Sequence, residues 1–206
     1  MMNWNKQYKY YYWGPLLYHT KVDDKFCDEM NTRGRKLNND YRYELAGHID
    51  KESQFLLEDR KYFVENTQSI FESYKDMYIN YIGEYDYNKF FKNKKFDMYD
   101  LWINIMKPGE TNPIHIHSGD LSFVLFTQMP DEIIKENEQY AGSGLGPGTI
   151  QFLYGQAQEH FATNKHFLPR KGDFFIFPAK LYHMVYPFKS NVERISIAGN
   201  INFIDK

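Results

Sequence analysis

The stretch "NPIHIHSGDLSF", residues 112–123, decides how the rest of the sequence is interpreted. It places two histidines one residue apart, directly after a proline and just before an apolar run. Side chains two positions apart on a β-strand point to the same face, so His115 and His117 would lie together on one side of a sheet. Two imidazoles on one face can bind a single transition-metal ion, and imidazole suits Fe, Zn, Cu and Ni. The stretch therefore predicts a strand that carries part of a metal site.

A third ligand is expected from "GDFFIFPAKLYHMVYPF" (172–188), which contains His183. This histidine lies on a predicted strand that follows a tight turn, as in a sheet that closes on itself. The alternative is that each histidine is an ordinary structural or exposed strand residue. The paired spacing and the third histidine in a matched strand favour metal binding. For the other four histidines we expect structural or exposed positions: His19, His48, His160 and His166.

The chain divides at about residue 97, where the apolar period changes. Before it, residues 24–37 and 51–82 have apolar residues at helical spacing. After it the period is two, and we predict strands at Leu101–Met106, Leu121–Gln128, Thr149–Tyr154, Asp173–Phe177, Leu181–Tyr186 and Val192–Phe203. Helices followed by short strands predict a mainly β, α+β protein, with helices on one face of an antiparallel sandwich or small barrel. We expect one domain over 1–206, with a helical N-terminal support region (1–97) and a β core (98–206).

Composition sets further bounds on the class of protein. The 206 residues suit one domain with a buried core, and the net charge of −2 gives no general electrostatic attraction for nucleic acid or a membrane. Cys27 is the only cysteine, which excludes an internal disulfide and is compatible with a reducing cytosol. There is no signal-peptide pattern and no apolar run of about 20 residues. We therefore expect a soluble cytoplasmic protein without a membrane or nucleic-acid partner.

The segment "ERISIAGNINF" (193–203) carries a second group of candidates. Arg194 and Ser196 share one strand face, and arginine is the residue best fitted to bind a carboxylate with two hydrogen bonds. The alternative is a surface arginine paired with Glu193. Because the segment directly follows the predicted strand of His183, a metal and an arginine could hold the two ends of a dicarboxylate.

Taken in order, H-x-H, "GDFFIFPAKLYH" and "RISIAGN" resemble the iron(II) and 2-oxoglutarate dependent oxygenases, especially a phage and marine-bacterial branch related to prolyl hydroxylases. The resemblance covers roughly residues 98 to 203 and implies a double-stranded β-helix core of the jelly-roll or cupin type. It implies His115 and His183 as iron ligands and Arg194, assisted by Ser196, as the clamp on 2-oxoglutarate. Asn104 lies on the strand just upstream, where the family often places a polar residue near the cosubstrate.

One position departs from the family pattern, because His117 stands where the family has Asp or Glu. Three interpretations remain open at this stage. His117 is a true ligand and the site has three histidines; or Asp120, three residues further on, supplies a carboxylate; or His117 does not coordinate and leaves a position open, as in halogenating relatives. We favour the first, because His117 has the right strand parity and needs no rearranged backbone.

The resemblance implies an enzyme that uses Fe(II), 2-oxoglutarate and O2 to hydroxylate an unidentified substrate, either a protein side chain such as proline or a small molecule. No catalytic residues beyond the metal ligands are expected. If the chain is phage-encoded, its location is the host cytoplasm. Two alternatives are a three-histidine cupin dioxygenase that does not use 2-oxoglutarate, and a non-catalytic β-helix module that binds metal structurally or serves in virion assembly.

Overall fold

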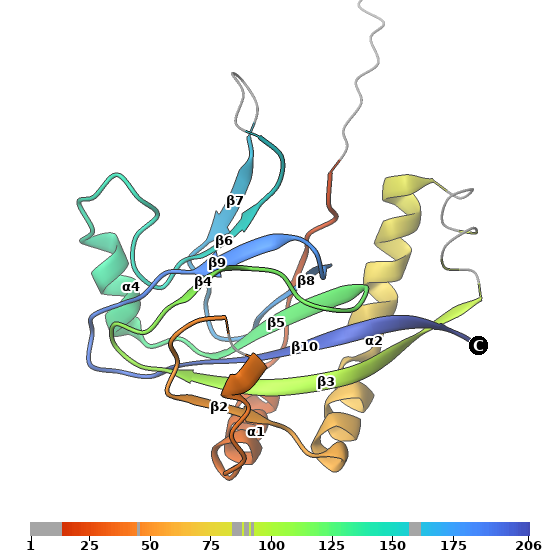
Figure 1. Ribbon diagram of the computed structural model, residues 1–206, viewed down its shortest axis with the longest axis horizontal. Helices are drawn as coiled ribbons and strands as arrows, with labels where there is room; N and C mark the ends of the chain where they lie inside the picture. The colour runs from red at the N-terminus through yellow and green to blue at the C-terminus, as the bar shows by residue number, and fades with distance from the viewer. Residues whose placement is uncertain (1–13, 45, 84–87, 89–90, 92, 157–161) are drawn as a thin grey trace, which may run out of the picture.

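Two antiparallel sheets face each other, and helices cover the outer side of the larger one (Figure 1). The computed structural model describes residues 14–44, 46–83, 88, 91, 93–156 and 162–206. The major sheet has the order β1 (Tyr18–Lys21), β8 (Asp173–Pro178), β5 (Leu121–Gln128), β10 (Arg194–Asp205), β3 (Lys94–Met106) and β2 (Lys51–Gln54). The minor sheet has the order β4 (Asn112–His115), β9 (Tyr182–Val185), β6 (Ile150–Leu153) and β7 (Asn164–Phe167).

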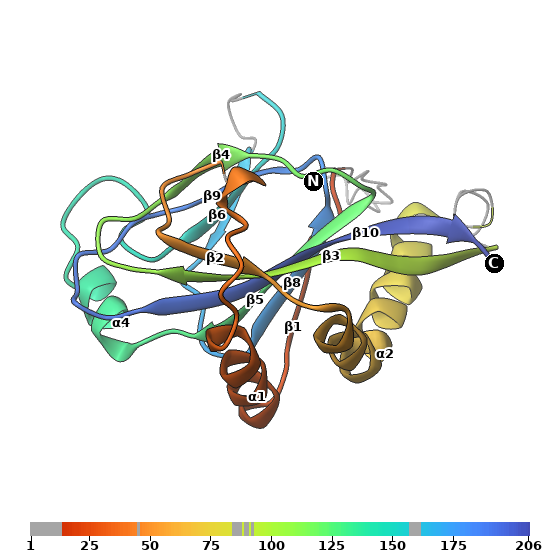
Figure 2. The same ribbon diagram turned by 60° about the horizontal axis from the view of Figure 1, so that its bottom comes forward.

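Helices α1 (Asp24–Arg35) and α2 (Leu57–Ile82) lie against the major sheet, on the side away from the minor sheet (Figure 2). The Asp23 carboxylate accepts a hydrogen bond from the backbone N–H of Phe26 at 2.8 Å and so caps the start of α1. Helix α2 ends at Gly83, whose φ of +86° suits glycine. A 3-10 helix (Arg42–Glu44) follows α1, and α4 (Asp131–Glu138) follows β5.

Aromatic side chains fill the space between the helices and the major sheet. Phe63 of α2 is fully buried and stacks on Phe123 of β5, with ring centroids 5.2 Å apart. Phe71, about two turns further along the same face of α2, contacts both Phe123 and Phe174 edge to face. A second core lies between the two sheets and includes Phe152 of β6. These aromatic contacts join helix α2 to the major sheet.

The predicted fold class, antiparallel β-sheets with N-terminal helices, is confirmed, but the predicted order of helices first and strands afterwards needs corrections at particular segments. Residues 51–54 were expected to begin a helix, but they form β2 and pair with β3. The sequence "KESQ" has no strand-like alternation, and only its pairing partner makes it a strand. Strand β3 begins at Lys94, seven residues before the predicted start. The N-terminal part of the chain thus contributes two edge strands, β1 and β2, as well as helices.

Within the described residues, no helix combines the length and the apolar character that crossing a bilayer requires.

Candidate active site

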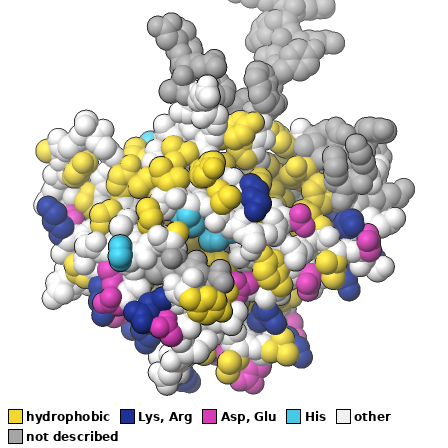
Figure 3. All heavy atoms as spheres, viewed as in Figure 1, with side chains coloured by type: hydrophobic (Ala, Val, Ile, Leu, Met, Phe, Trp, Pro, Cys, Tyr) yellow, Lys and Arg dark blue, Asp and Glu magenta, His cyan; other side chains and the backbone are white. Residues whose placement is uncertain are grey.

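A cavity of about 230 Å³ lies between the two sheets. Its lining comes from strands β2, β3, β5, β8 and β10 of the major sheet and from β4, β6 and β9 of the minor sheet. Figure 3 shows histidine side chains beside a hollow near the centre of one face of the molecule. The cavity is therefore open to solvent at one end, and the facing sheets enclose the rest.

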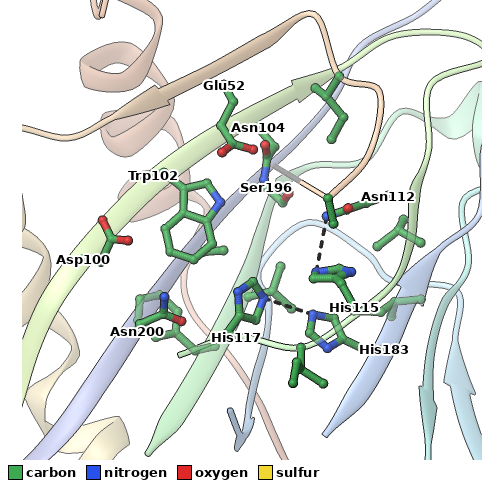
Figure 4. Close-up of a pocket in the computed structure, with 18 of the residues that line it drawn as sticks. Glu52, Asp100, Trp102, Asn104, Asn112, His115, His117, His183, Ser196 and Asn200 are labelled. Carbon is green, nitrogen blue, oxygen red and sulfur yellow. Dashed lines mark hydrogen bonds between the residues drawn. The ribbon is translucent and has the colours of Figure 1, made fainter. Parts of the chain in front are cut away.

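Three histidines converge on this cavity, as Figure 4 shows. His115 at the end of β4 and His183 of β9 are Cα partners across the minor sheet. His117 lies two residues past His115, beyond the end of β4, and its Nε2 is 3.2 Å from Nε2 of His183. One ring nitrogen from each histidine lies within 4.8 Å of the others. The structure thus brings together the three imidazoles proposed as ligands.

Backbone carbonyls orient two of the three rings. Nδ1 of His115 lies 2.6 Å from the carbonyl oxygen of Pro113, and Nδ1 of His183 lies 2.9 Å from that of Leu181. Each contact places the ring proton on Nδ1 and leaves the Nε2 lone pair for a metal, which is how metal-binding histidines are commonly held. The backbone N–H of His117 donates to the carbonyl of Ala179 at 2.9 Å, which anchors the segment beyond the strand.

The surroundings keep these imidazoles neutral. Burial, reinforced by the nearby His115, lowers the pKa of His117 to about 3. Burial also lowers the pKa of His183 well below its ordinary value, and the other two imidazoles act in the same direction. Burial likewise lowers the pKa of His115. Neutral imidazole is the form that coordinates metal ions, so the site is prepared to accept a cation without first losing protons.

Asp120 does not join the histidine cluster. Its side chain is bound elsewhere: Oδ2 accepts a hydrogen bond from the backbone N–H of Phe203 at 2.7 Å. Its own backbone N–H donates to the carbonyl of Ile201 at 3.0 Å, so both contacts tie this loop to β10. The alternative of Asp120 as the carboxylate ligand therefore lacks the geometry it needs.

Arg194 is buried in the same cavity and lacks an anionic partner among the described residues. Nη1 donates to the carbonyl of Gly148 at 3.3 Å, Nη2 lies 2.6 Å from the sulfur of Met106, and Nε has no hydrogen-bond partner there. Burial lowers the pKa of this guanidinium to about 9. A buried cation without a counter-charge is costly, so this side chain fits the binding of a carboxylate from a ligand.

Ser196 and Asn104 lie beside this arginine and also line the cavity. They are Cα partners across β10 and β3, and both are buried. Asn104 lies between the Glu52 carboxylate and the indole of Trp102; its amide nitrogen can donate to Glu52 while its oxygen accepts from Nε1 of Trp102 at 3.2 Å. The polar face of the major sheet thus continues from Arg194 towards the histidines.

Several cavity residues were not predicted from the sequence. Trp102 lies two positions before Asn104, so the two side chains point to the same face of β3. This alternation could have predicted that Trp102 faces the cavity. Glu52 lies in a segment whose pattern predicted a helix, and no sequence signal pointed to it. The other unpredicted polar residues of the lining are Tyr41, Asp100, Asn112, Ser118 and Asn200.

Comparisons with known proteins agree with this geometry. Residues 100–200 match the model of the family described as "Putative 2OG-Fe(II) oxygenase". No curated protein sequence matches the chain. A 2OG-Fe(II) oxygenase family oxidoreductase from Burkholderia pseudomallei is similar in structure, with 11% identity, a TM-score of 0.54 and coverage of 90% of this chain and 84% of that one. A prolyl-4-hydroxylase from Pseudomonas putida shares 12% identity at a TM-score of 0.54, with 92% of each chain covered.

The fold is therefore the double-stranded β-helix of these oxidoreductases, and the predicted fold class is confirmed. The predicted resemblance to the 2OG-Fe(II) oxygenases is confirmed over residues 100–200. Enzymes of this family use Fe(II), 2-oxoglutarate and O2. The residues present fit both cofactors, because three convergent imidazoles suit iron, and Arg194, which has no anionic partner among the described residues, suits a carboxylate.

Proposed function

We propose that this enzyme is a dioxygenase that hydroxylates a C–H bond of its substrate, with His115, His117 and His183 holding the iron. Arg194, with Ser196 beside it, would bind the far carboxylate of 2-oxoglutarate. The observation that carries this proposal is the buried guanidinium with an unsatisfied Nε in the same cavity as three convergent imidazoles.

The roles of the protein side chains follow from their positions. The three imidazoles would hold the iron and leave room beside it for the cosubstrate and O2. When bound, iron supplies the reduction of O2, coupled to the decarboxylation of 2-oxoglutarate: R–H, O2 and 2-oxoglutarate become R–OH, succinate and CO2. The charged fork of Arg194 fixes the cosubstrate at the closed end of the cavity. The two facing sheets exclude bulk water from the reacting groups.

A prolyl residue in a peptide is the first substrate to test. The fold is shared with a prolyl-4-hydroxylase, and the histidines lie beside the open end of the cavity, where a side chain of another protein could enter. Ile114 and Ile116 flank His115 and are 56% and 41% exposed, so they offer apolar surface for such a chain.

One observation favours a second candidate function. The metal site has three imidazoles, and no carboxylate of the described residues belongs to the cluster. This ligand set also fits a three-histidine cupin dioxygenase that does not use 2-oxoglutarate.

Succinate production separates these functions. Aerobic incubation with Fe(II) and 2-oxoglutarate should yield succinate, slowly without substrate and faster with a peptidyl-proline panel. Arg194→Ala should raise the concentration of 2-oxoglutarate required. Iron binding without any binding of 2-oxoglutarate would support the cupin-type function instead. Zinc held too tightly to exchange, with no turnover on any iron preparation, would contradict both enzymes.

A further inference from the structure

A polar pair lies at the end of the cavity away from Arg194. Asp100 of β3 and Asn200 of β10 are Cα partners, both are buried, and both line the cavity (Figure 4). On β10, Asn200 is six positions beyond Arg194 on the same face. Neither residue has a part in holding the metal or 2-oxoglutarate in the proposed function.

Asp100 presents a buried carboxylate that receives only neutral donors. Its Oδ2 accepts from the hydroxyl of Tyr41 at 2.6 Å, and its Oδ1 accepts from Nε2 of Gln54 at 2.9 Å. Among the described residues, no lysine, arginine or histidine forms an ion pair with it. Burying a carboxylate is costly unless a positive charge or strong donors compensate, so the site is suited to receive a cation.

Asn200 adds an independent observation on the neighbouring strand. Its side chain is 4% exposed, and its amide oxygen Oδ1 is buried without a donor in the part of the chain that the structure describes. Buried acceptors are nearly always paired, so an unpaired one that borders a cavity indicates a missing donor. The Asp100 carboxylate and the Asn200 amide oxygen together suit a ligand group that carries several N–H donors and a positive charge.

Trp102 connects this pair to the metal ligands. It is the next cavity-facing residue after Asp100 on β3, and its ring lies 5.5 Å from that of His117, centroid to centroid. Figure 4 shows the indole between Asp100 and His117. An indole face attracts cations, and two residues of strand span roughly 7 Å. A cation held at Asp100 would therefore place carbons several bonds away beside the histidines.

We propose that Asp100 and Asn200 form the subsite that recognises the substrate, and that the substrate carries an ammonium or guanidinium group. The inference rests on the proposed function and deepens it by naming the substrate class. The cation belongs either to a lysine or arginine side chain in a peptide, with the reacting residue next to it or within the same side chain, or to a free small amine.

Binding of matched probes tests this subsite without turnover. The anaerobic protein with Fe(II) and 2-oxoglutarate is titrated calorimetrically with Nα-acetyl-lysine amide and with Nα-acetyl-norleucine amide, which has a similar side chain without the charge. We expect the lysine probe to bind about tenfold tighter or more, the effect of one charge-assisted hydrogen bond in a buried site. Titration with 1,5-diaminopentane identifies the source: tighter binding than the lysine probe indicates a free amine, and weaker binding a peptide.

Variants assign the preference to these residues. Asp100→Asn should remove the preference for the charged probe, and Asn200→Leu should reduce it several-fold. Asp97→Asn, the same change at an exposed position of β3, should leave it intact. If Asp100→Asn fails to fold, Asn200→Leu decides the question.

Equal affinity for the two probes, in protein that binds 2-oxoglutarate, would overturn the subsite and leave the proposed function standing. Absence of 2-oxoglutarate binding would instead overturn the proposed function, and the substrate assignment with it.

Discussion

His115 and His183 lie directly opposite each other as Cα partners of β4 and β9, with ring centroids 4.1 Å apart. The antiparallel register of the minor sheet therefore sets the separation of these two proposed ligands. His117 is different, because it lies beyond β4 and is positioned by the hydrogen bond from its backbone to Ala179. Two of the proposed ligands thus depend on strand pairing, and the third depends on the segment beyond β4.

Removing a strand-borne ligand should abolish tight metal binding. For His183→Ala we expect the affinity for Fe(II) or Co(II) to fall by roughly two orders of magnitude or more, because the ring supplies one of three nitrogen ligands. Anaerobic titration followed by absorbance measures the change. The control is His166→Ala on β7, whose side chain is exposed. Unchanged affinity in His183→Ala would exclude this ring as a ligand.

Substitutions of His117 distinguish a ligand from an open coordination position. If His117 coordinates, His117→Ala weakens metal binding, whereas His117→Asp retains it because a carboxylate can take the same place. Affinity measured by the same titration, together with succinate yield, checks both variants. Equal affinities of the wild type and His117→Ala would show that this imidazole stays off the metal.

Arg194→Met should separate stability from cosubstrate binding. The substitution removes a buried guanidinium that lacks an anionic partner among the described residues, so we expect the free energy of unfolding to stay the same or rise by about 1 kcal/mol. Affinity for 2-oxoglutarate should fall by about tenfold or more. Urea unfolding and calorimetry measure the two quantities. Arg170→Met, at an exposed position, serves as the control and should change neither.

Phe63→Ala should destabilise the support behind the site. The ring is fully buried and contacts Phe26 and Phe123, so its removal leaves a cavity between α2 and the major sheet. We expect a loss of about 3–5 kcal/mol in the free energy of unfolding. Leu57→Ala on the same helix, 58% exposed, should cost less than about 0.5 kcal/mol. Denaturant unfolding measures the free energy of unfolding of both variants. Equal losses would contradict the assignment of Phe63 to the core.

Acid should destabilise the metal-free protein. Burial, then the neighbouring His115, lowers the pKa of His117 to about 3 in the folded state, whereas an unfolded histidine titrates near about 6.5. Between these values the unfolded chain binds more protons, so stability is greatest above about pH 6.5 and falls as the pH falls towards about 3. Urea unfolding at about pH 7 and about pH 5 measures the slope. His117→Leu should make it shallower, and His166→Leu should not.

The strands of the central core could be predicted because each is a continuous apolar run bounded by turns. The predicted limits Leu121–Gln128 coincide with β5. The short edge strands could not be predicted in this way. The sequence "KESQ" of β2 is polar and becomes a strand only through its hydrogen bonds to β3. The conformation of such an edge strand is therefore set by the strand with which it pairs and not by its own sequence.

The candidate site was predictable where strand parity and residue type coincide. His115, His183 and Arg194 combine both. His117 was expected on the same strand as His115 but lies beyond the end of β4, and the structure still places all four residues in one cavity. Asp100 was missed because the predicted strand began one residue after it, at Leu101, whereas β3 extends back to Lys94. Because Asp100 lay outside the predicted strand, the sequence did not predict to which face of the sheet its carboxylate would point.

Strand β10 carries Arg194 at one end of the cavity and Asn200 at the other, and it is hydrogen-bonded to β3 on one side and β5 on the other. Six residues of strand span roughly 20 Å, and a strand paired along both edges cannot stretch. It therefore fixes the distance between Arg194, the proposed contact of 2-oxoglutarate, and Asn200, the proposed contact of the substrate. Changes in the surrounding loops can alter which molecules enter, but the distance between these two proposed contacts changes only if the register of the sheet changes.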